Sequence, residues 1–246
     1  MDSALIEGAR PVIEAIRAGR RRVRRVHVPE GDGSAARRAL DALLAERGIE
    51  RVPGKAGEAV HAEADPYPEE PFEALLSEPS PRFLVALDRV TDVGNLGSIA
   101  RSAEGAGVTG LMLENRNAPA ITTGALRASA GALEHLRVGR APNLARAIDL
   151  ARREALRVLV ADAAGESLAD LPAELLGADL IWVFGSEDLG VRPGIRKLAD
   201  ATVGIPLLGQ VGSLGVAAAA AYLLLRTAEA RVRGPGAKIA GRAQIS

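Results

Sequence analysis

The sequence predicts an α/β fold in two parts, a small α/β unit followed by a larger α/β domain built on a parallel sheet. Short apolar strands alternate with helix-forming segments along most of the 246 residues. A stretch rich in proline and acidic residues interrupts this alternation. Hydrophobic residues make up 48% of the chain, enough for packed cores. We therefore divide the chain into residues 1–62, a linker at 63–81, and a domain at 82–246.

The small unit is predicted from changes of hydrophobic period. Apolar residues recur at helical spacing in residues 10–18, 34–47 and 55–60, and residues 23–28 and 49–52 have the short apolar pattern of strands. The segment that follows holds five prolines among acidic residues, a composition typical of an extended linker. The prolines are Pro66, Pro68, Pro71, Pro79 and Pro81.

The larger domain repeats strand and helix. The expected strands are residues 83–87, 110–113, 136–138, 157–161, 180–184 and 201–205. The expected helices are residues 96–106, 122–129, 144–153, 192–198 and 214–230. Apolar strands separated by helices indicate a largely parallel sheet covered on both faces. The tail from Val232 has no periodicity, and we expect it to fray.

Composition excludes several kinds of site. Basic and acidic residues balance at 31 each, so net charge gives no argument for a nucleic-acid partner. Aromatic residues are only 2% of the chain, which argues against base-stacking RRM or OB folds. With no cysteine and three histidines, we expect no metal. Residues 1–19 lack the apolar core of a signal peptide, and residues 211–225 are too short for a convincing membrane span, so we expect a cytoplasmic protein without a membrane partner.

Three glycine-rich loops stand where strands end. They are residues 92–97 with Arg101 downstream, residues 184–190, and residues 205–215. Each loop alone is compatible with phosphate binding at a helix N-terminus. A dinucleotide loop formed by Gly209, Gly212 and Gly215 is the weaker interpretation, because it lies near the C-terminal end and lacks a following strand with an acidic residue.

Taken together and in this order, the loops resemble the three signature motifs of the SpoU/TrmH methyltransferases of the SPOUT superfamily, and residues 128–134 and 143–147 are also similar to that family. Residues 1–62 resemble more loosely its ribosomal-protein-L30e-like RNA substrate-binding domain. The resemblance implies a deep trefoil knot, S-adenosyl-L-methionine (SAM) held in the knot, and a homodimer. The alanine run at residues 217–221 offers a smooth face for packing against a second copy.

The resemblance also implies a set of site residues. Gly185, Ile205 and Leu214 would line the cofactor pocket through their backbone, and the catalytic residues would be Asn95, Arg101, Glu187 and Ser213. Methyl transfer to a ribose 2'-hydroxyl needs a group that orients or deprotonates the hydroxyl. Arginine stays protonated at neutral pH and is a poor general base, so we expect Arg101 to bind phosphate and to stabilise alkoxide charge.

Structural alternatives accompany these assignments. Arg101 would be a solvated surface arginine, Glu187 a carboxylate stabilised by local helix amides, and Ser213 the N-cap of the last helix. For Ser213, the N-cap role and the catalytic role are compatible.

The implied reaction is SAM-dependent 2'-O-methylation of a ribose in RNA. The 23S rRNA is the expected partner, because the additional N-terminal domain resembles the rRNA-directed members. A tRNA-directed enzyme is one alternative. A catalytically impaired homologue that binds SAM and RNA is another, because Gly215 stands where the family usually has asparagine.

Two further sets of residues stand outside these motifs. Five arginines, Arg20, Arg21, Arg22, Arg24 and Arg25, lie within six residues and would form either a solvated face or a phosphate-binding edge. The three histidines, His27, His61 and His135, are expected to lie apart from one another, in structural or surface roles.

Overall fold

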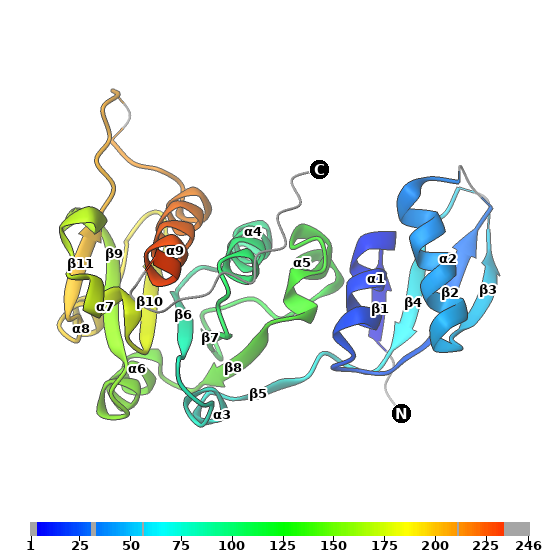
Figure 1. The fold of residues 1–246 in the computed structure, drawn as a ribbon, viewed down its shortest axis with the longest axis horizontal. Helices are drawn as coiled ribbons and strands as arrows, with labels where there is room; N and C mark the ends of the chain where they lie inside the picture. The colour runs from blue at the N-terminus through cyan, green and yellow to red at the C-terminus, as the bar shows by residue number, and fades with distance from the viewer. Residues whose placement is uncertain (1–3, 31–32, 56, 211, 234–246) are drawn as a thin grey trace.

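A computed structural model describes residues 4–30, 33–55, 57–210 and 212–233. The chain forms a four-stranded and a seven-stranded sheet, each with its own helices (Figure 1). The predicted frayed tail falls largely on residues 234–246, outside the described residues.

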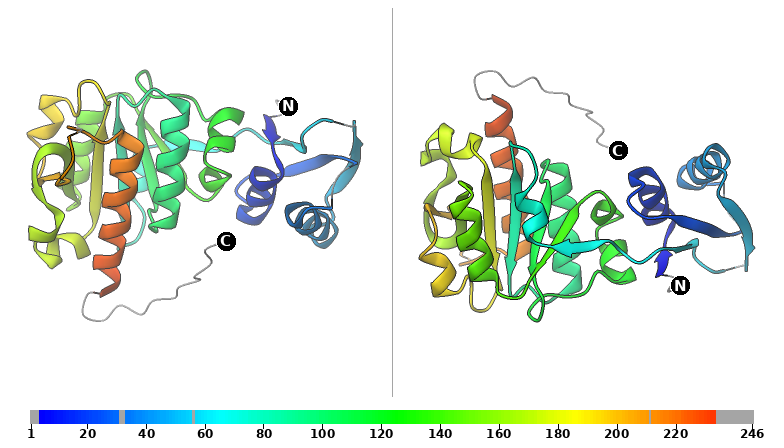
Figure 2. Two further views of the ribbon diagram at one scale, coloured as in Figure 1. Left: turned by 90° about the horizontal axis from the view of Figure 1, so that it is seen from above. Right: turned by 90° about the horizontal axis from the view of Figure 1, so that it is seen from below.

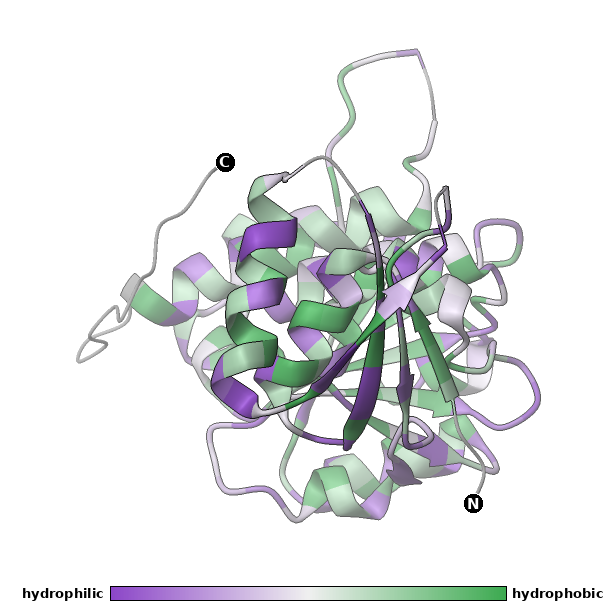
Figure 3. Ribbon diagram, turned by 90° about the vertical axis from the view of Figure 1, so that its right-hand side faces the viewer, coloured by the Kyte–Doolittle hydropathy of each residue, from purple (hydrophilic) through white to green (hydrophobic). Residues whose placement is uncertain are grey.

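The small unit has strand order β1-β4-β2-β3. Its strands are β1 (Ala4–Glu7), β2 (Val23–Pro29), β3 (Glu50–Gly54) and β4 (His61–Ala64). Its helices are α1 (Ala9–Ala18) and α2 (Ala35–Arg47). Both helices were predicted, as were β2 and β3. Seen from this end of the molecule, hydrophilic and hydrophobic segments alternate along the ribbons (Figure 3).

One predicted helix of the small unit is wrong. The described part of residues 55–60 contains no helix, and the chain instead enters β4, which pairs antiparallel with both β1 and β2. The sequence of β4 gives little strand signal, because its two buried positions, Ala62 and Ala64, carry alanine. Pairing on both sides, rather than local propensity, makes this segment a strand.

The expected linker is also corrected. Residues 63–81 contain the end of β4, the strand β5 (Glu69–Pro71) and the helix α3 (Glu73–Leu76). Strand β5 pairs in parallel with β8 at the edge of the large sheet. Two of its acidic side chains form ion pairs with that strand, Glu70 with Arg137 at 2.5 Å and Glu69 with Arg140 at 2.6 Å. The proline-rich segment is therefore built into both sheets.

The large sheet is parallel in every pairing and has strand order β11-β9-β10-β6-β7-β8-β5. This confirms the predicted parallel α/β fold. Its other strands are β6 (Phe83–Asp88), β7 (Gly110–Glu114), β8 (Arg137–Ala141), β9 (Arg157–Ser167), β10 (Leu180–Gly185) and β11 (Ala201–Gly204). Its longer helices are α4 (Val93–Gly105), α6 (Leu144–Arg153) and α9 (Val216–Arg233). The shorter ones are α5 (Thr123–Ala128), α7 (Ala173–Gly177), α8 (Pro193–Arg196) and the 3₁₀ turns η1 (Ala132–Glu134) and η2 (Leu168–Asp170).

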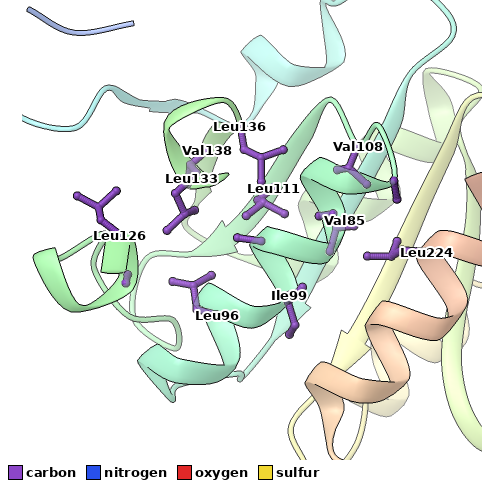
Figure 4. Close-up of a cluster of buried hydrophobic side chains, with 14 of the residues drawn as sticks. Val85, Leu96, Ile99, Val108, Leu111, Leu126, Leu133, Leu136, Val138 and Leu224 are labelled. Carbon is purple, nitrogen blue, oxygen red and sulfur yellow. The ribbon is translucent and has the colours of Figure 1, made fainter. Parts of the chain in front are cut away.

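Helices cover both faces of the large sheet. Side chains of α4, α5 and α9 pack with Val85 and Leu87 of β6 in one buried cluster, and those of α3, α6 and α8 pack with Leu84 and Ala86 in another. Figure 4 shows the first cluster, with Leu96 of α4 close to the sheet. The same cluster continues into the core of the small unit, which lies beside α5 (Figure 2).

Across the described ranges, the helices are too short or too polar to cross a membrane. The trefoil knot stays a prediction.

Candidate functional site

A cavity of about 560 Å³ opens at the carboxyl ends of β10 and β11, beside residues 161–163 in the middle of β9. Its lining includes Gly185 and Glu187 from the second glycine-rich loop, and Ile205, Ser213 and Leu214 from the third. The structure therefore brings together five of the seven predicted site residues. Ligands of parallel α/β proteins bind in this position, beyond the carboxyl ends of the strands.

The second loop closes tightly on itself. The Gly190 amide donates to the Ser186 carbonyl oxygen at 2.8 Å. A Cβ atom on Gly185 would lie only 2.1 Å from the carbonyl carbon of Gly190, a distance that backbone cannot accommodate. Glycine at position 185 is thus required by the close approach of two backbone segments.

Glu187 connects the second loop to the third. Its Oε1 accepts a hydrogen bond from the Val216 amide at the start of α9, at 3.0 Å. A Cβ atom on Gly215 would lie 3.0 Å from the same oxygen. The carboxylate therefore stabilises the N-terminus of α9, which is distant in sequence, whereas the structural alternative proposed stabilisation by local helix amides. It also lines the cavity.

Ser213 does not cap the last helix. Helix α9 begins at Val216, and the Gly215 carbonyl oxygen accepts from the Ala219 amide at 3.0 Å, which places the N-cap at Gly215. Ser213 is exposed and lines the cavity. The N-cap alternative for Ser213 is therefore wrong.

The first loop places Asn95 and Arg101 on helix α4, and neither is among the residues that line the cavity. The Asp92 carboxylate caps this helix by accepting from the Asn95 amide at 2.7 Å. Arg101 lies further along α4 and is exposed, and it has no ion pair or hydrogen bond to the described residues. An exposed guanidinium of this kind can bind an anionic partner. The same observation is also what the structural alternative, a solvated surface arginine, predicts.

A buried ionic network that sequence reasoning missed supports these loops. Asp88 is fully buried at the end of β6 and accepts two hydrogen bonds from Arg192, one from the amide and one from Nε, both at 2.7 Å. Arg192 Nη2 also donates to Glu114 Oε1 at 3.1 Å. Although burial opposes the charge, hydrogen bonds from Asn117, the Leu144 amide and Arg192 hold the pKa of Glu114 below its ordinary value. A sequence signal existed, because Asp88 and Glu114 end two otherwise apolar strands.

The neighbouring Arg89 adopts a left-handed backbone conformation, with φ at 60°. Its guanidinium donates to the Gly190 carbonyl oxygen at 3.3 Å, so it joins the turn after β6 to the second loop. Its buried Nε atom has no hydrogen-bond partner among the described residues.

The arginine cluster of the small unit is mostly paired within the chain. Arg21 is buried against Glu134, Arg24 binds Asp65 at 2.6 Å, and Arg25 lies 3.4 Å from Glu63. Arg20 donates to the Leu136 carbonyl oxygen. Arg22 is exposed. Four of the five arginines therefore bind groups of the protein itself, and the phosphate-binding edge stays a prediction.

The histidines are not all apart. The rings of His27 and His61 stack with their centroids 4.5 Å apart, and His27 also lies 3.2 Å from a Glu63 oxygen. His135 interacts with Glu14 at 2.9 Å. Sequence reasoning missed the stack because it depends on the pairing of β2 with the unpredicted strand β4. In the part of the chain that the structure describes, acidic and histidine side chains form no group of three suited to a metal ion.

Fold and site together define a parallel α/β protein with a ligand cavity built from glycine-rich loops beyond the strand ends. Residues 82–225 match the model of the SpoU rRNA Methylase family. The chain belongs to this family, and the resemblance seen in its motifs is confirmed.

Individual relatives agree with the family. An uncharacterised tRNA/rRNA methyltransferase of Mycolicibacterium vanbaalenii is 31% identical over 247 residues, covering 94% of this chain and 77% of the relative. A similarly named protein of Mycobacterium avium is 37% identical over 67% of this chain, which spans about half (52%) of that relative's length. The SpoU methyltransferase AviRb of Streptomyces viridochromogenes, solved in complex with the cofactor AdoMet, has a TM-score of 0.75 and 26% identity, covering 94% and 91% of the two chains.

Proposed function

We propose that this protein transfers a methyl group from SAM to a ribose 2'-hydroxyl in RNA, with 23S rRNA as the substrate. The observation that carries this proposal is the single cavity to which the second and third motif loops contribute Gly185, Glu187, Ile205, Ser213 and Leu214. Membership of the SpoU rRNA Methylase family supports the reaction class. The AdoMet complex of AviRb supports the cofactor.

The residues of the cavity fit SAM. A volume of about 560 Å³ lies within the range of about 300–1,000 Å³ typical of cofactor pockets. Ile205 and Leu214 offer apolar surface for an adenine ring, and the backbone of the second loop offers hydrogen-bonding groups beside Gly185. The Glu187 carboxylate places negative charge at the wall, where a cationic cofactor would be favoured. When bound, SAM supplies an activated methyl group.

The chain's own residues would orient the nucleophile. The ribose 2'-oxygen would gain the methyl group, S-adenosyl-L-homocysteine would be the leaving group, and the hydroxyl proton would pass to solvent water. Exposed Arg101 would bind the adjacent RNA phosphate and stabilise negative charge on the 2'-oxygen as the proton departs. Asn95 and Ser213 would hold the ribose hydroxyl in line with the methyl group.

A homodimer is part of the proposal. Helix α9 exposes Tyr222 and Leu225, and the neighbouring third loop exposes Leu207 and Leu208. Such exposed large apolar side chains, on a helix and on the loop before it, would be covered in a protein interface. In this dimer, the alanine run beside them allows the two copies of α9 to approach closely.

A catalytically impaired homologue is the second candidate, and Gly215 is the observation that favours it. Where the family usually has asparagine, this chain presents no side chain, and the Glu187 carboxylate lies next to the vacant position. Such a protein would bind SAM and RNA without turnover.

One experiment separates these functions. Ribose methylation is mapped by mass spectrometry on rRNA and tRNA from a strain lacking the gene, and the purified protein is then tested for restoring the missing methyl group. A single 2'-O-methyl group absent from 23S rRNA and restored in vitro supports the proposal. A methyl group missing from tRNA changes the substrate, and intact methylation of both RNAs contradicts enzymatic activity.

A further inference from the structure

The small unit is fixed to the large unit by a buried ion pair. The guanidinium of Arg21 binds the carboxylate of Glu134 in η1 through two hydrogen bonds, one of them from Nε at 3.0 Å. The two side chains are only 2% and 1% exposed. Because both charges are removed from water, only a narrow range of geometry leaves them paired.

Tyr67 adds a second polar contact at the same place. Its hydroxyl oxygen lies 2.7 Å from the Leu133 carbonyl oxygen and 2.8 Å from that of Leu136. The guanidinium groups of Arg20 and Arg21 lie 5.8 and 5.6 Å from the centre of its ring. We call Arg20, Arg21, Tyr67 and Glu134 the junction cluster. Residues from the small unit and the connecting segment thus converge on η1.

Backbone packing at η1 leaves no space for α1 of the small unit to slide along this turn. Gly131 has φ at +90°, and a Cβ atom there would lie 2.8 Å from the Glu14 Cβ and 3.0 Å from the Pro11 Cα. Helix α1 therefore contacts this turn directly. At the other end of the junction, the Thr123 hydroxyl donates to the Leu5 carbonyl oxygen at 3.0 Å.

Helix α5, which contacts the small unit through Thr123, also packs against α4, the helix that carries Arg101. A Cβ atom on Gly97 of α4 would lie 2.4 Å from the Ala128 Cβ, so the two helices are in closest contact. Leu96 of α4 lies near Leu126 and Leu133 in the same apolar cluster (Figure 4). A continuous close-packed path thus runs from α1 through η1 and α5 to α4.

We propose that the junction cluster is a specificity determinant that holds the small unit at one fixed distance from the catalytic loops, so that only one nucleotide of a bound RNA reaches the cavity. This inference rests on the proposed function. An RNA that binds both units must span the distance between them. A rigid connection between the units allows one such distance, whereas a flexible connection would allow many. The substrate would be a structured RNA that extends beyond the target nucleotide and its neighbours.

The chemistry of the cluster favours a geometric role over a purely stabilising one. A buried ion pair contributes little stability compared with apolar side chains of similar volume, whereas it restricts the arrangement of the groups that carry it. Replacing both charges together by Arg21→Met and Glu134→Leu should keep the chain folded and remove that restriction. Tyr67→Phe tests the same cluster by removing only the hydroxyl contacts. Arg153→Ala is the matched control, because it also removes an arginine from an ion pair, here with Asp149 at the surface of α6.

The experiment compares two RNA substrates. One is bulk rRNA from a strain lacking the gene, and the other is a short oligonucleotide that carries only the target nucleotide and its neighbours. We expect the double variant to bind SAM and to methylate the oligonucleotide within about twofold of wild type. On rRNA, kcat/KM at the native nucleotide should fall at least about tenfold, a difference of about 1.4 kcal/mol, and methyl groups should appear at neighbouring nucleotides. Tyr67→Phe should show a smaller effect in the same direction, and Arg153→Ala none.

Small-angle scattering of each variant completes the test. We expect a broader distribution of distances between the units in the double variant. The proposal would be overturned if the double variant showed the broader distribution and still methylated only the native nucleotide. An unchanged distribution would also overturn it, because the cluster would then not fix the junction. A wild-type protein that methylates no ribose contradicts the proposed function instead.

Discussion

The junction around η1 and the loops around the cavity are built in opposite ways. At the junction, polar groups such as Arg21, Glu134 and Tyr67 have their partners within the chain. Around the cavity, Ser213, Leu214 and Leu208 are exposed. The junction is thus complete in the isolated chain, whereas the cavity loops have surfaces that a cofactor, RNA or a second copy would cover. Removing one partner of a pair at the junction should therefore change stability, whereas substitutions at the cavity should change binding or turnover.

The largest expected effect is at the junction. Glu134→Ala leaves the Arg21 cation buried without its partner, and we expect the free energy of unfolding to fall by about 3–5 kcal/mol. Urea denaturation measures this loss. The exposed pair of Arg153 and Asp149 supplies the control, since Asp149→Ala should change stability by less than about 1 kcal/mol. Equal losses in the two variants would contradict the contrast between junction and surface.

Arg101→Ala should leave stability unchanged and lower activity, the converse of Glu134→Ala. Because Arg101 is exposed and forms no ion pair or hydrogen bond with the described residues, stability and SAM affinity should be unchanged. Methyl transfer should fall by about 100- to 1,000-fold, the effect typical of losing one group that stabilises transition-state charge. Single-turnover assays and calorimetry with SAM measure the two quantities. Full activity in this variant would remove Arg101 from the catalytic set while leaving the family assignment intact.

High pH should loosen the junction. Burial raises the pKa of Tyr67 from 10.0 to about 12, against the opposing effect of Arg20. Because the folded state holds the phenol proton more tightly, this contribution to stability is complete below pH 10 and is lost as the pH rises from 10 to 12. The full contribution is on the order of 2 kcal/mol. Wild type should lose more stability than Tyr67→Phe over this interval in thermal unfolding, and parallel curves would contradict the assignment.

Gly185→Ala should affect the cavity more than the fold as a whole. The new Cβ atom would meet the Gly190 backbone, so the second loop must move, at a cost of about 1–3 kcal/mol. SAM binding should weaken by about 10- to 100-fold in calorimetry. Gly194→Ala is the control, because a Cβ atom there meets nothing within 4 Å. Unaltered affinity in Gly185→Ala would place the cofactor elsewhere.

The contrast between the regions also explains how far sequence reasoning reached. Hydrophobic periodicity predicted the strands and main helices of the large unit, because buried parallel strands such as β6 and β10 are continuous apolar runs. Loop motifs predicted five of the residues that line the cavity, whereas Asn95 and Arg101 do not line it. The junction could not be predicted in this way, because Arg21 and Glu134 are 113 residues apart in sequence and each resembles a surface charge. Strand β4 was missed for the same reason, since it depends on partners distant in the chain.

The smallest expected effect is at Gly215, where the two candidate functions diverge. Gly215 occupies the N-cap of α9, and asparagine is a better N-cap than glycine by a few tenths of a kcal/mol, so Gly215→Asn should fold normally. The new side chain would displace the Glu187 oxygen, which a flexible carboxylate permits. If Glu187 already performs the role of the absent amide, the rate of methyl transfer should stay level or fall, and Gly215→Ala, which displaces the carboxylate without adding an amide, should behave in the same way. If wild type binds SAM and RNA without turnover and only Gly215→Asn gains activity in a single-turnover assay, the amide is the missing group and the protein is the impaired homologue. Measurable turnover by wild type, with no gain in either variant, assigns the enzymatic function to the chain as it stands.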